Sequence, residues 1–340
     1  MLRDGLETSP LVGWLVYDNS GVVMEYITLP GTNLRVSRIC LGTQQFANSW
    51  EWPMDQATAT ATVVAALDVG INFFDTAEAY GVDGDRSSEH MLGVALQGRR
   101  HEAVIATKFG FHAGENQRVY DGEMVTAAIE ESLSALQTDY IDLFQIHWPG
   151  NIGFLETDTA GQWPKAAAGV VEALERAVEA GKIKYYGWCN FGTEDMLAFK
   201  AAGGRSVSNQ LPYNLLWRAI ECGILPACIT ENVGVLCYSP LAQALLTGKY
   251  VNSKMVPEGR RRSRLFAHDS TPTSRHGGRG LEDELFSPGA PAPDGNDRYG
   301  STNQKDLPLE LQTGMYPGYG AIGALQAICD GTFVAPVISY

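Results

Sequence analysis

The chain has 340 residues, of which 45% are hydrophobic and 19% are charged, and its net charge is −14 at pH 7. These values are typical of a globular protein with a large core, folded as one large domain or two ordinary ones. The negative charge argues against nucleic acid or an anionic membrane as the main partner.

Neither a membrane anchor nor a disulfide framework is predicted. No stretch approaches the roughly 20 apolar residues of a membrane span, and the first 25 residues lack the basic start and apolar core of a secretory signal. The six cysteines form no Cys-x-x-Cys pair and no zinc spacing, so we expect reduced thiols and no metal site. A cytoplasmic location is expected, with an organelle-targeting peptide as the open alternative.

The N-terminal part is predicted to consist of an extension, residues 1–24, followed by a β-hairpin over residues 24–34. Pro30 and Gly31 supply its turn. The hairpin leads into a first strand at residues 38–41.

Strand and helix patterns then alternate along the chain. Apolar strand patterns end near Thr43, Asp75, Lys108, His147, Asn190, Gln210 and Ser239. Helices are predicted at 55–67, from Ser87 (as the capping residue), through Val125, Ile129, Leu133 and Leu136 on one face, at 166–180, from Thr193 and from Ala219.

This alternation predicts an α/β fold with a parallel sheet and right-handed crossovers. Seven units over about 200 residues indicate a (β/α)8 TIM barrel in which one unit is not recognised. An open doubly wound sheet is the alternative. It would need a Gly-x-Gly-x-x-Gly turn after its first strand, and residues 41–46, Leu-Gly-Thr-Gln-Gln-Phe, do not supply one.

Ionisable residues stand at the ends of three successive strand patterns. Asp75 closes the run Ile71–Phe74, Tyr80 follows five residues later, Lys108 closes the next run, and His147 closes the third. By itself, Asp75 could be an N-capping residue and Tyr80 an exposed loop residue. Equivalent positions in consecutive units instead indicate an active site at the carboxyl-terminal rim of a barrel.

Several motifs resemble those of the aldo-keto reductases, over about residues 36–286. They are Asp75-Thr-Ala-Glu-Ala-Tyr80-Gly, Thr107-Lys108, Asp142-Leu-Phe-Gln-Ile-His147, Asn209-Gln210 and Tyr238-Ser239-Pro240-Leu241. The resemblance implies a barrel whose N-terminal hairpin closes its bottom. It also implies NADP(H)-dependent reduction of aldehydes or ketones by hydride transfer.

The resemblance assigns the catalytic roles to four residues. Tyr80 would be the general acid, Lys108 the ammonium that lowers its pKa, and Asp75 the partner of Lys108. His147 would orient the carbonyl.

The resemblance also implies cofactor and substrate contacts. The implied cofactor-binding residues are Thr43, Asn190, Gln210, Tyr238, Ser239, Leu241 and Lys249, with Asn190 and Gln210 on the carboxamide and Tyr238 stacked on the nicotinamide ring. Cys189 stands where many relatives have Ser. Phe46, Trp148 and Trp217 are candidate walls of the substrate pocket, as is Trp188, although each could equally be a core residue.

The C-terminal part departs from the family pattern. Residues 287–296, Ser-Pro-Gly-Ala-Pro-Ala-Pro-Asp-Gly-Asn, have the composition of a loop, where relatives continue with two helices around a last strand. We therefore divide the chain into residues 1–24, the barrel at 25–286, and a divergent segment at 287–340, with the last βα unit atypical or incomplete. The family's 2′-phosphate contacts lie there, so NADP(H) rests on the resemblance and NAD(H) stays open.

Two other functions remain open at this point. One is a cofactor-binding regulatory subunit, as in channel-associated members of the superfamily. The other is a catalytically impaired barrel variant with an altered C-terminus. The expected partner is a small carbonyl compound, and the protein would be a monomer or a homo-oligomer. Glycosidase chemistry would need two carboxylates facing one site, and Asp75 is committed to Lys108.

Overall fold

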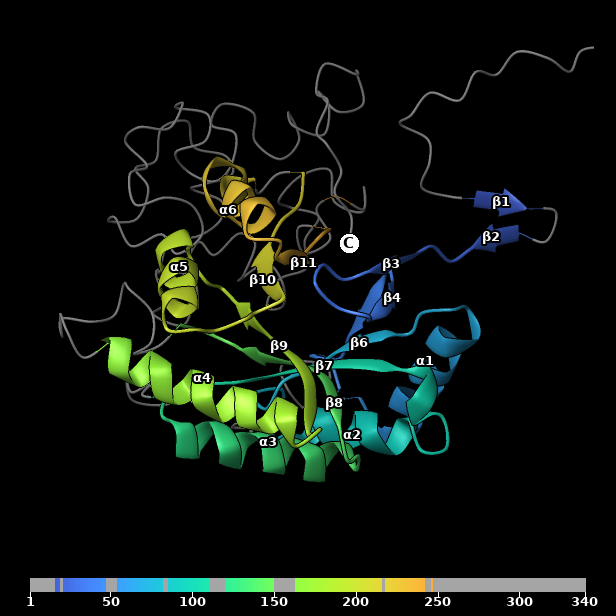
Figure 1. The fold of residues 1–340 in the computed structure, drawn as a ribbon. Coiled ribbons are helices and arrows are strands. Elements are labelled where there is room, and N and C mark those ends of the chain that lie inside the picture. The colour runs from blue at the N-terminus through green and yellow to red at the C-terminus, as the bar shows by residue number, and fades with distance from the viewer. Residues whose placement is uncertain are drawn as a thin grey trace, which may run out of the picture.

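Seven parallel strands form one continuous sheet in the computed structural model (Figure 1). The structure describes residues 16–18, 21–46, 54–81, 85–110, 120–149, 163–215, 218–241 and 246. The strands follow one another in chain order across the sheet: β5 (Cys40–Gly42), β6 (Phe73–Asp75), β7 (Val104–Phe109), β8 (Ile141–Ile146), β9 (Ile183–Cys189), β10 (Ser208–Pro212) and β11 (Gly234–Tyr238). This order is the one predicted from the alternating sequence pattern.

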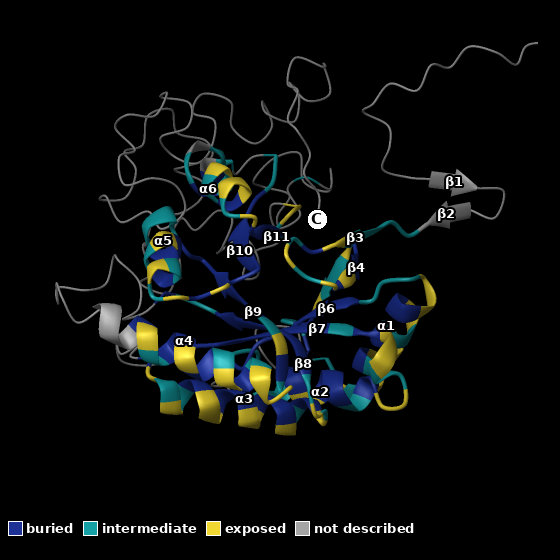
Figure 2. Ribbon diagram, in the orientation of Figure 1, coloured by how far each residue is buried: buried dark blue, intermediate teal, exposed yellow. Residues whose placement is uncertain are grey.

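Helices connect the strands and cover the outer face of the curved sheet (Figure 1). They are α1 (Gln56–Asp68), α2 (Ser87–Ala95), α3 (Gly122–Leu136), α4 (Trp163–Glu179), α5 (Thr193–Ala201) and α6 (Ile224–Thr230), with short 3₁₀ turns η1 (Arg100–Glu102) and η3 (Ala219–Cys222). Helices α1 to α5 each pack against the next. Their buried sides face the strands and their exposed sides face outward (Figure 2). The fold is an α/β barrel of the (β/α)8 class, as predicted.

Acidic side chains begin two of the helices. Asp55 accepts from the backbone N–H of Thr58 at 2.7 Å, and Asp121 accepts from that of Met124 at 2.8 Å, which satisfies donors that a helix start leaves unpaired. The prediction that Ser87 caps α2 is wrong. Asp85 accepts from the Ser87 N–H at 3.0 Å instead.

Two apolar clusters stabilise the barrel. The larger lies between the sheet and the helices, and the smaller fills the barrel interior. The interior cluster joins Phe73 and Ala106 to Leu29, Leu34 and Val36 of the N-terminal hairpin. That hairpin pairs β3 (Tyr26–Thr28) with β4 (Arg35–Ser37) in antiparallel fashion, and it closes the barrel as predicted. Burying each such Leu or Val side chain contributes about 1.5–3 kcal/mol.

The structure describes part of the N-terminal extension and none of the C-terminal segment. Within residues 1–24, β1 (Val16–Asp18) pairs with β2 (Gly21–Val23) in antiparallel fashion. The divergent segment at 287–340, with which the last βα unit was predicted to be atypical or incomplete, lies outside the described residues. Across the described part of the chain, no helix is both long enough and apolar enough to cross a membrane.

Candidate active site

Inward-facing side chains change from apolar to polar toward the carboxyl ends of the strands. Phe73 and Ala106 belong to the interior apolar cluster, and Asp75 and Lys108 lie two residues later on the same strands. Residues two apart in a strand point to the same face of the sheet. Asp75 and Lys108 therefore also face inward, nearer the rim at which barrel active sites lie.

Lys108 is the centre of the site. Its ammonium donates to Asp75 Oδ2 at 2.6 Å, to the backbone oxygen of Thr76 at 2.9 Å and to the Tyr80 hydroxyl oxygen at 3.1 Å. These contacts use all three donors of a lysine ammonium, and the side chain is fully buried. Because the Tyr80 oxygen accepts from Lys108, the O–H hydrogen of Tyr80 remains able to donate to another group.

The two largest effects on the pKa of Tyr80 oppose each other. Removal of the phenol from solvent raises it, the Lys108 ammonium lowers it, and the first effect prevails, so that the pKa rises to about 12. The predicted lowering of this pKa by Lys108 is therefore present, but burial, which the sequence motifs do not reveal, outweighs it. Burial lowers the pKa of Lys108 whereas Asp75 and Tyr80 raise it, and the net shift is upward. At neutral pH the site pairs a neutral phenol with an ammonium.

His147 lies beside Tyr80 at the end of β8. Its backbone N–H donates to the Phe109 oxygen at 2.8 Å, which extends the pairing of β7 and β8 to the rim. The rings of Tyr80 and His147 meet edge to face with centroids 6.1 Å apart. The structure thus brings together the four residues to which the sequence motifs pointed: Asp75, Tyr80, Lys108 and His147.

Gln210 connects this group to strand β10. Its amide donates to Asp75 Oδ1 at 2.7 Å, and its oxygen accepts from the Cys189 thiol at 3.6 Å. Each carboxylate oxygen of Asp75 therefore has a buried partner, Lys108 on one side and Gln210 on the other. Burial raises the pKa of the Cys189 thiol to about 12, although Lys108 lowers it, so this thiol is neutral and can donate. The Gln210–Asp75 contact was not predicted.

Asn190 links His147 to strand β11. Its amide donates to the His147 backbone oxygen at 3.0 Å, and its oxygen accepts from the Tyr238 hydroxyl at 2.9 Å. Asn190 has a φ of 63°, a left-handed conformation that Asn tolerates better than most residues. Asn190 thus joins Tyr238, another residue predicted to bind nicotinamide, to the segment that carries His147.

Comparisons with known proteins agree with this geometry. A family model described as "Aldo/keto reductase family" matches residues 38–287. The chain belongs to this family. "Aldo-keto reductase YhdN" of Bacillus subtilis is 36% identical over 230 residues, 66% of this chain and 65% of that protein. The chain thus spans just under two thirds of the length of YhdN.

This chain covers a larger share of two further relatives. "Protein tas" of Escherichia coli is 34% identical over 271 residues, which span 72% of this chain and 75% of that protein. A solved aldo-keto reductase of Klebsiella pneumoniae in complex with NADPH is 30% identical, with a TM-score of 0.53, covering 73% of this chain and 74% of that one.

Three of the remaining predicted cofactor residues, Thr43, Ser239 and Leu241, follow the carboxyl ends of strands β5 and β11. Thr43 is fully buried, and its N–H and hydroxyl both donate to the Asp75 backbone oxygen, at 2.8 and 3.1 Å. Ser239 has a φ of 52°, and its backbone oxygen accepts from Asn214 at 3.0 Å. Leu241 is 55% exposed. Their contacts with a cofactor stay predictions, and Lys249 lies outside the described residues.

The aromatic candidates for the substrate pocket differ in position. Trp148 is half-buried and stacks on His147 with ring centroids 6.3 Å apart, which places it at the rim. Phe46 is buried within the larger apolar cluster, and its role in the pocket stays a prediction. Trp188 is fully buried and stacks on Phe191 in that cluster. It is therefore a core residue, which was the alternative to its role as a pocket wall. Trp217 lies outside the described residues.

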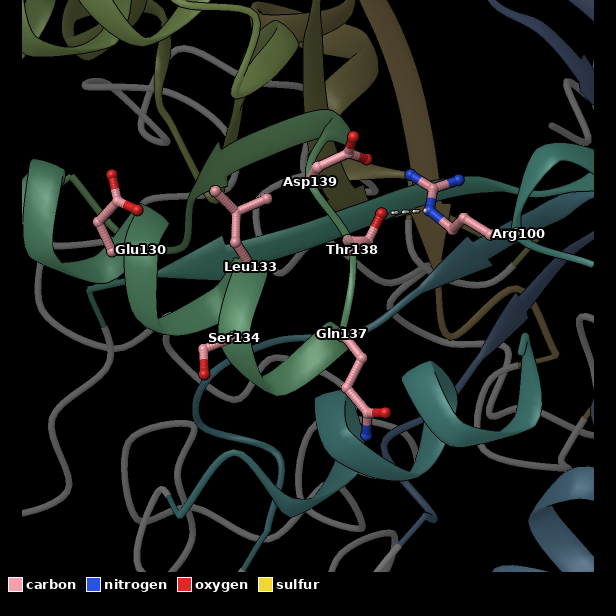
Figure 3. A pocket seen from close by; sticks show the side chains of 7 residues that line it. All are labelled: Arg100, Glu130, Leu133, Ser134, Gln137, Thr138 and Asp139. Atoms are coloured by element: carbon pink, nitrogen blue, oxygen red, sulfur yellow. Dashed lines mark hydrogen bonds between the residues drawn. The ribbon is translucent and has the colours of Figure 1, made fainter. Parts of the chain in front are cut away.

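An open depression of about 650 Å³ lies away from this site (Figure 3). Arg100 precedes β7, and Thr138 and Asp139 precede β8, so the depression lies at the amino-terminal ends of the strands. The Arg100 guanidinium donates to Thr138 there at 3.1 Å. Barrel active sites lie at the opposite, carboxyl-terminal end of the strands, and nothing in the lining points to catalysis. The lining residues are Arg100, Glu130, Leu133, Ser134, Gln137, Thr138 and Asp139.

Replacing Gln210 by Leu is expected to destabilise the fold by about 1.5–3 kcal/mol, the range for hydrogen bonds to charged groups. The change leaves Asp75 Oδ1 without its partner, inside a buried site. Urea unfolding of the purified variant measures the loss. Gln137→Leu is the matched control, because Gln137 bonds Gln97 in an exposed contact. Equal stability of the two variants would contradict a structural role for Gln210.

Proposed function

We propose that the protein reduces aldehydes or ketones to alcohols with NADP(H) as hydride donor and Tyr80 as general acid. The observation that carries the proposal is the hydrogen bond from the Lys108 ammonium to the Tyr80 oxygen, at 3.1 Å, with Asp75 held on the same ammonium at 2.6 Å. The membership of the aldo/keto reductase family supports it, as does the NADPH complex of the Klebsiella relative.

The donor and acceptor groups at the rim fit a nicotinamide carboxamide. A carboxamide needs both acceptors and donors. Asn190 offers an acceptor, because its amide nitrogen already donates to the His147 backbone oxygen and to Cys189 Sγ. Gln210 offers an acceptor and the N–H that does not bond Asp75. Each keeps one oxygen lone pair beyond the contacts described above, since a carbonyl oxygen can accept twice. Tyr238 is half-buried and is held beside Asn190 by its hydroxyl, so its ring is a candidate stacking surface for the nicotinamide. A bound nicotinamide would supply the hydride for the reaction.

Side chains of this protein would carry out the proton transfer. Tyr80 is neutral at pH 7, because its pKa is about 12, and its O–H can donate to a carbonyl oxygen. As that proton leaves, the Tyr80 phenolate forms beside the Lys108 ammonium. The ammonium attracts the phenolate more strongly than it attracts the neutral phenol. An interaction that strengthens as charge develops lowers the barrier itself.

His147 and Trp148 would hold the substrate. The His147 ring meets Tyr80 edge to face, so a carbonyl oxygen bound between them could accept a hydrogen bond from each. Trp148, stacked on His147, would bound the pocket with an apolar surface. Such positioning contributes by holding the reacting atoms in line.

The test of this proposal is a titration of the purified protein with NADPH, and separately with NADH, followed by tryptophan fluorescence. Saturable quenching that is tighter for NADPH, followed by NADPH consumption with a panel of aldehydes and ketones, is the expected result. A folded protein that binds neither nucleotide would contradict the proposal.

Tyr238→Ala is expected to weaken NADPH binding by about 5- to 150-fold, because aromatic stacking contributes about 1–3 kcal/mol by alanine substitution. The same titration measures the loss. Tyr213→Phe serves as a control, since Tyr213 follows β10 and donates its hydroxyl to Glu221. Unchanged NADPH affinity in Tyr238→Ala would argue against stacking.

A further inference from the structure

Arg86 is the centre of a buried charged cluster on the outer side of the strands that carry the site. One terminal nitrogen of its guanidinium donates to Glu89 at 3.0 Å and to Ser132 at 2.9 Å. The other donates to Glu78 and to Glu131, both at 2.8 Å. The Arg86 side chain is 16% exposed, that of Glu78 9% and that of Glu89 0%. The cluster therefore joins the loop after β6 to α2 and α3.

Glu78 ties this cluster to the loop that carries Tyr80. Its second carboxylate oxygen accepts from the Gly110 N–H at 2.6 Å, and its own backbone N–H donates to the Lys108 oxygen at 3.0 Å. Glu78 thus makes hydrogen bonds to the residues on both sides of Phe109, Lys108 and Gly110. These bonds lie at the end of β7, the strand that carries Lys108. It lies two residues before Tyr80, so the ion pair with Arg86 fixes the loop directly against the Lys108 strand.

The chain adopts unfavourable backbone conformations around this contact. Arg86 has a φ of 58°, a left-handed conformation that costs a residue with a side chain about 1–2 kcal/mol. Gly81 has a φ of 153°, and a Cβ there would come within 1.9 Å of the Asp85 carboxylate. Removing charged groups from water is also costly unless they are paired. A strained backbone and buried charges beside the loop that carries Tyr80 suggest that this arrangement serves the function of the site.

We propose that the Arg86–Glu78 ion pair is a positioning device that holds the Tyr80 hydroxyl within hydrogen-bonding distance of the Lys108 ammonium. This inference rests on the proposed function, in which Tyr80 delivers the proton. Arg86 and Glu78 act through the loop, from the outer side of the sheet, whereas Lys108 faces the interior. The contact of Glu89 with the Thr107 hydroxyl, at 2.6 Å, anchors the same cluster to β7 one residue before Lys108.

Glu78→Gln is the first test, because glutamine keeps an acceptor for the Gly110 N–H and loses the charge that faces Arg86. The kcat of carbonyl reduction is expected to fall about 10- to 100-fold, as for loss of a charge-assisted hydrogen bond or a small displacement of a reacting group. NADPH affinity and the substrate KM should stay within about twofold, since neither binding contact changes. A kcat within twofold of the wild type would overturn the proposal.

Arg86→Met combined with Glu89→Gln is the second variant. Neutralising Glu89 removes the more deeply buried of the two carboxylates that loss of Arg86 would leave unpaired. Glu78 keeps the Gly110 N–H as a partner, so the protein should fold while the Glu78 pair is absent. The same fall in kcat is expected, and Arg86→Lys should recover part of it, because an ammonium keeps the charge without the fork of the guanidinium. A double variant that turns over normally would also overturn the proposal.

Glu131→Gln is the matched control, because Glu131 pairs with the same guanidinium nitrogen but its side chain is 62% exposed on α3 and does not touch the loop. It should leave kcat unchanged. A fall as large as that of Glu78→Gln would show a general effect of the cluster and overturn the positioning role.

Amide hydrogen exchange separates this inference from the proposed function, because it needs no activity. Faster exchange is expected for residues 76–80 and Gly110 in Glu78→Gln, and unchanged exchange in Glu131→Gln. A wild type inactive on every carbonyl would refute the proposed function. Selective loop exchange would then still support the positioning of Tyr80, and exchange that rises nowhere or everywhere would refute it.

Discussion

Tyr80→Phe is expected to lower carbonyl turnover by about 10²- to 10⁴-fold, the usual contribution of a positioned general acid, with NADPH affinity unchanged. The substitution removes the only group at this position that can give a proton. It keeps the ring that meets His147 edge to face, and Lys108 keeps its contacts with Asp75 and Thr76. Steady-state consumption of NADPH and the fluorescence titration measure the two quantities separately.

Tyr185→Phe is the control for this prediction. The Tyr185 hydroxyl donates to Asn33 of the N-terminal hairpin at 3.1 Å in an exposed contact, at the opposite end of the barrel from Tyr80. It should leave turnover unchanged. If Tyr80→Phe retained turnover within a few fold of the wild type, another group or water would be the acid, and the role assigned to Tyr80 would be wrong.

The order and positions of the strands could be predicted because their signal is local. Apolar runs stop abruptly at Asp75 and Lys108, and the structure ends β6 at Asp75 and β7 at Phe109, one residue after Lys108. The start of α2 could be predicted to within one residue, but its N-cap could not, because Ser is a good capping residue and Arg is not. The N-cap is Arg86 in a left-handed turn, which its contacts with Glu78 and Glu89 hold in place.

The grouping of Asp75, Lys108 and His147 follows from topology, since consecutive parallel strands end at the same rim. The contact of Gln210 with Asp75 has no such signal, because 135 residues separate the two. The pKa of Tyr80 also depends on tertiary structure. Sequence motifs identify the charge beside the phenol, but the burial that outweighs this charge depends on how the whole rim packs.

Lys108→Met is expected to reduce turnover by at least about 10²-fold, because it removes the stabilisation of a developing charge. Lys108 is the group that lowers the pKa of Tyr80, so its loss raises that pKa further and makes proton donation harder. The variant should also be destabilised by about 3–5 kcal/mol, as when one partner of a buried ion pair is removed. Turnover and urea unfolding measure the two effects.

Asp75→Asn combined with Lys108→Met separates folding from catalysis. Neutralising Asp75 removes the unpaired carboxylate, and Gln210 can still bond the asparagine oxygen, so most of the lost stability should return. Turnover should stay low, because burial still raises the pKa of Tyr80 and no ammonium faces its oxygen. Comparison of the single and double variants gives the coupling between the two residues for each property. If stability and turnover recovered together, Lys108 would serve only to neutralise Asp75, and its action on Tyr80 would be refuted.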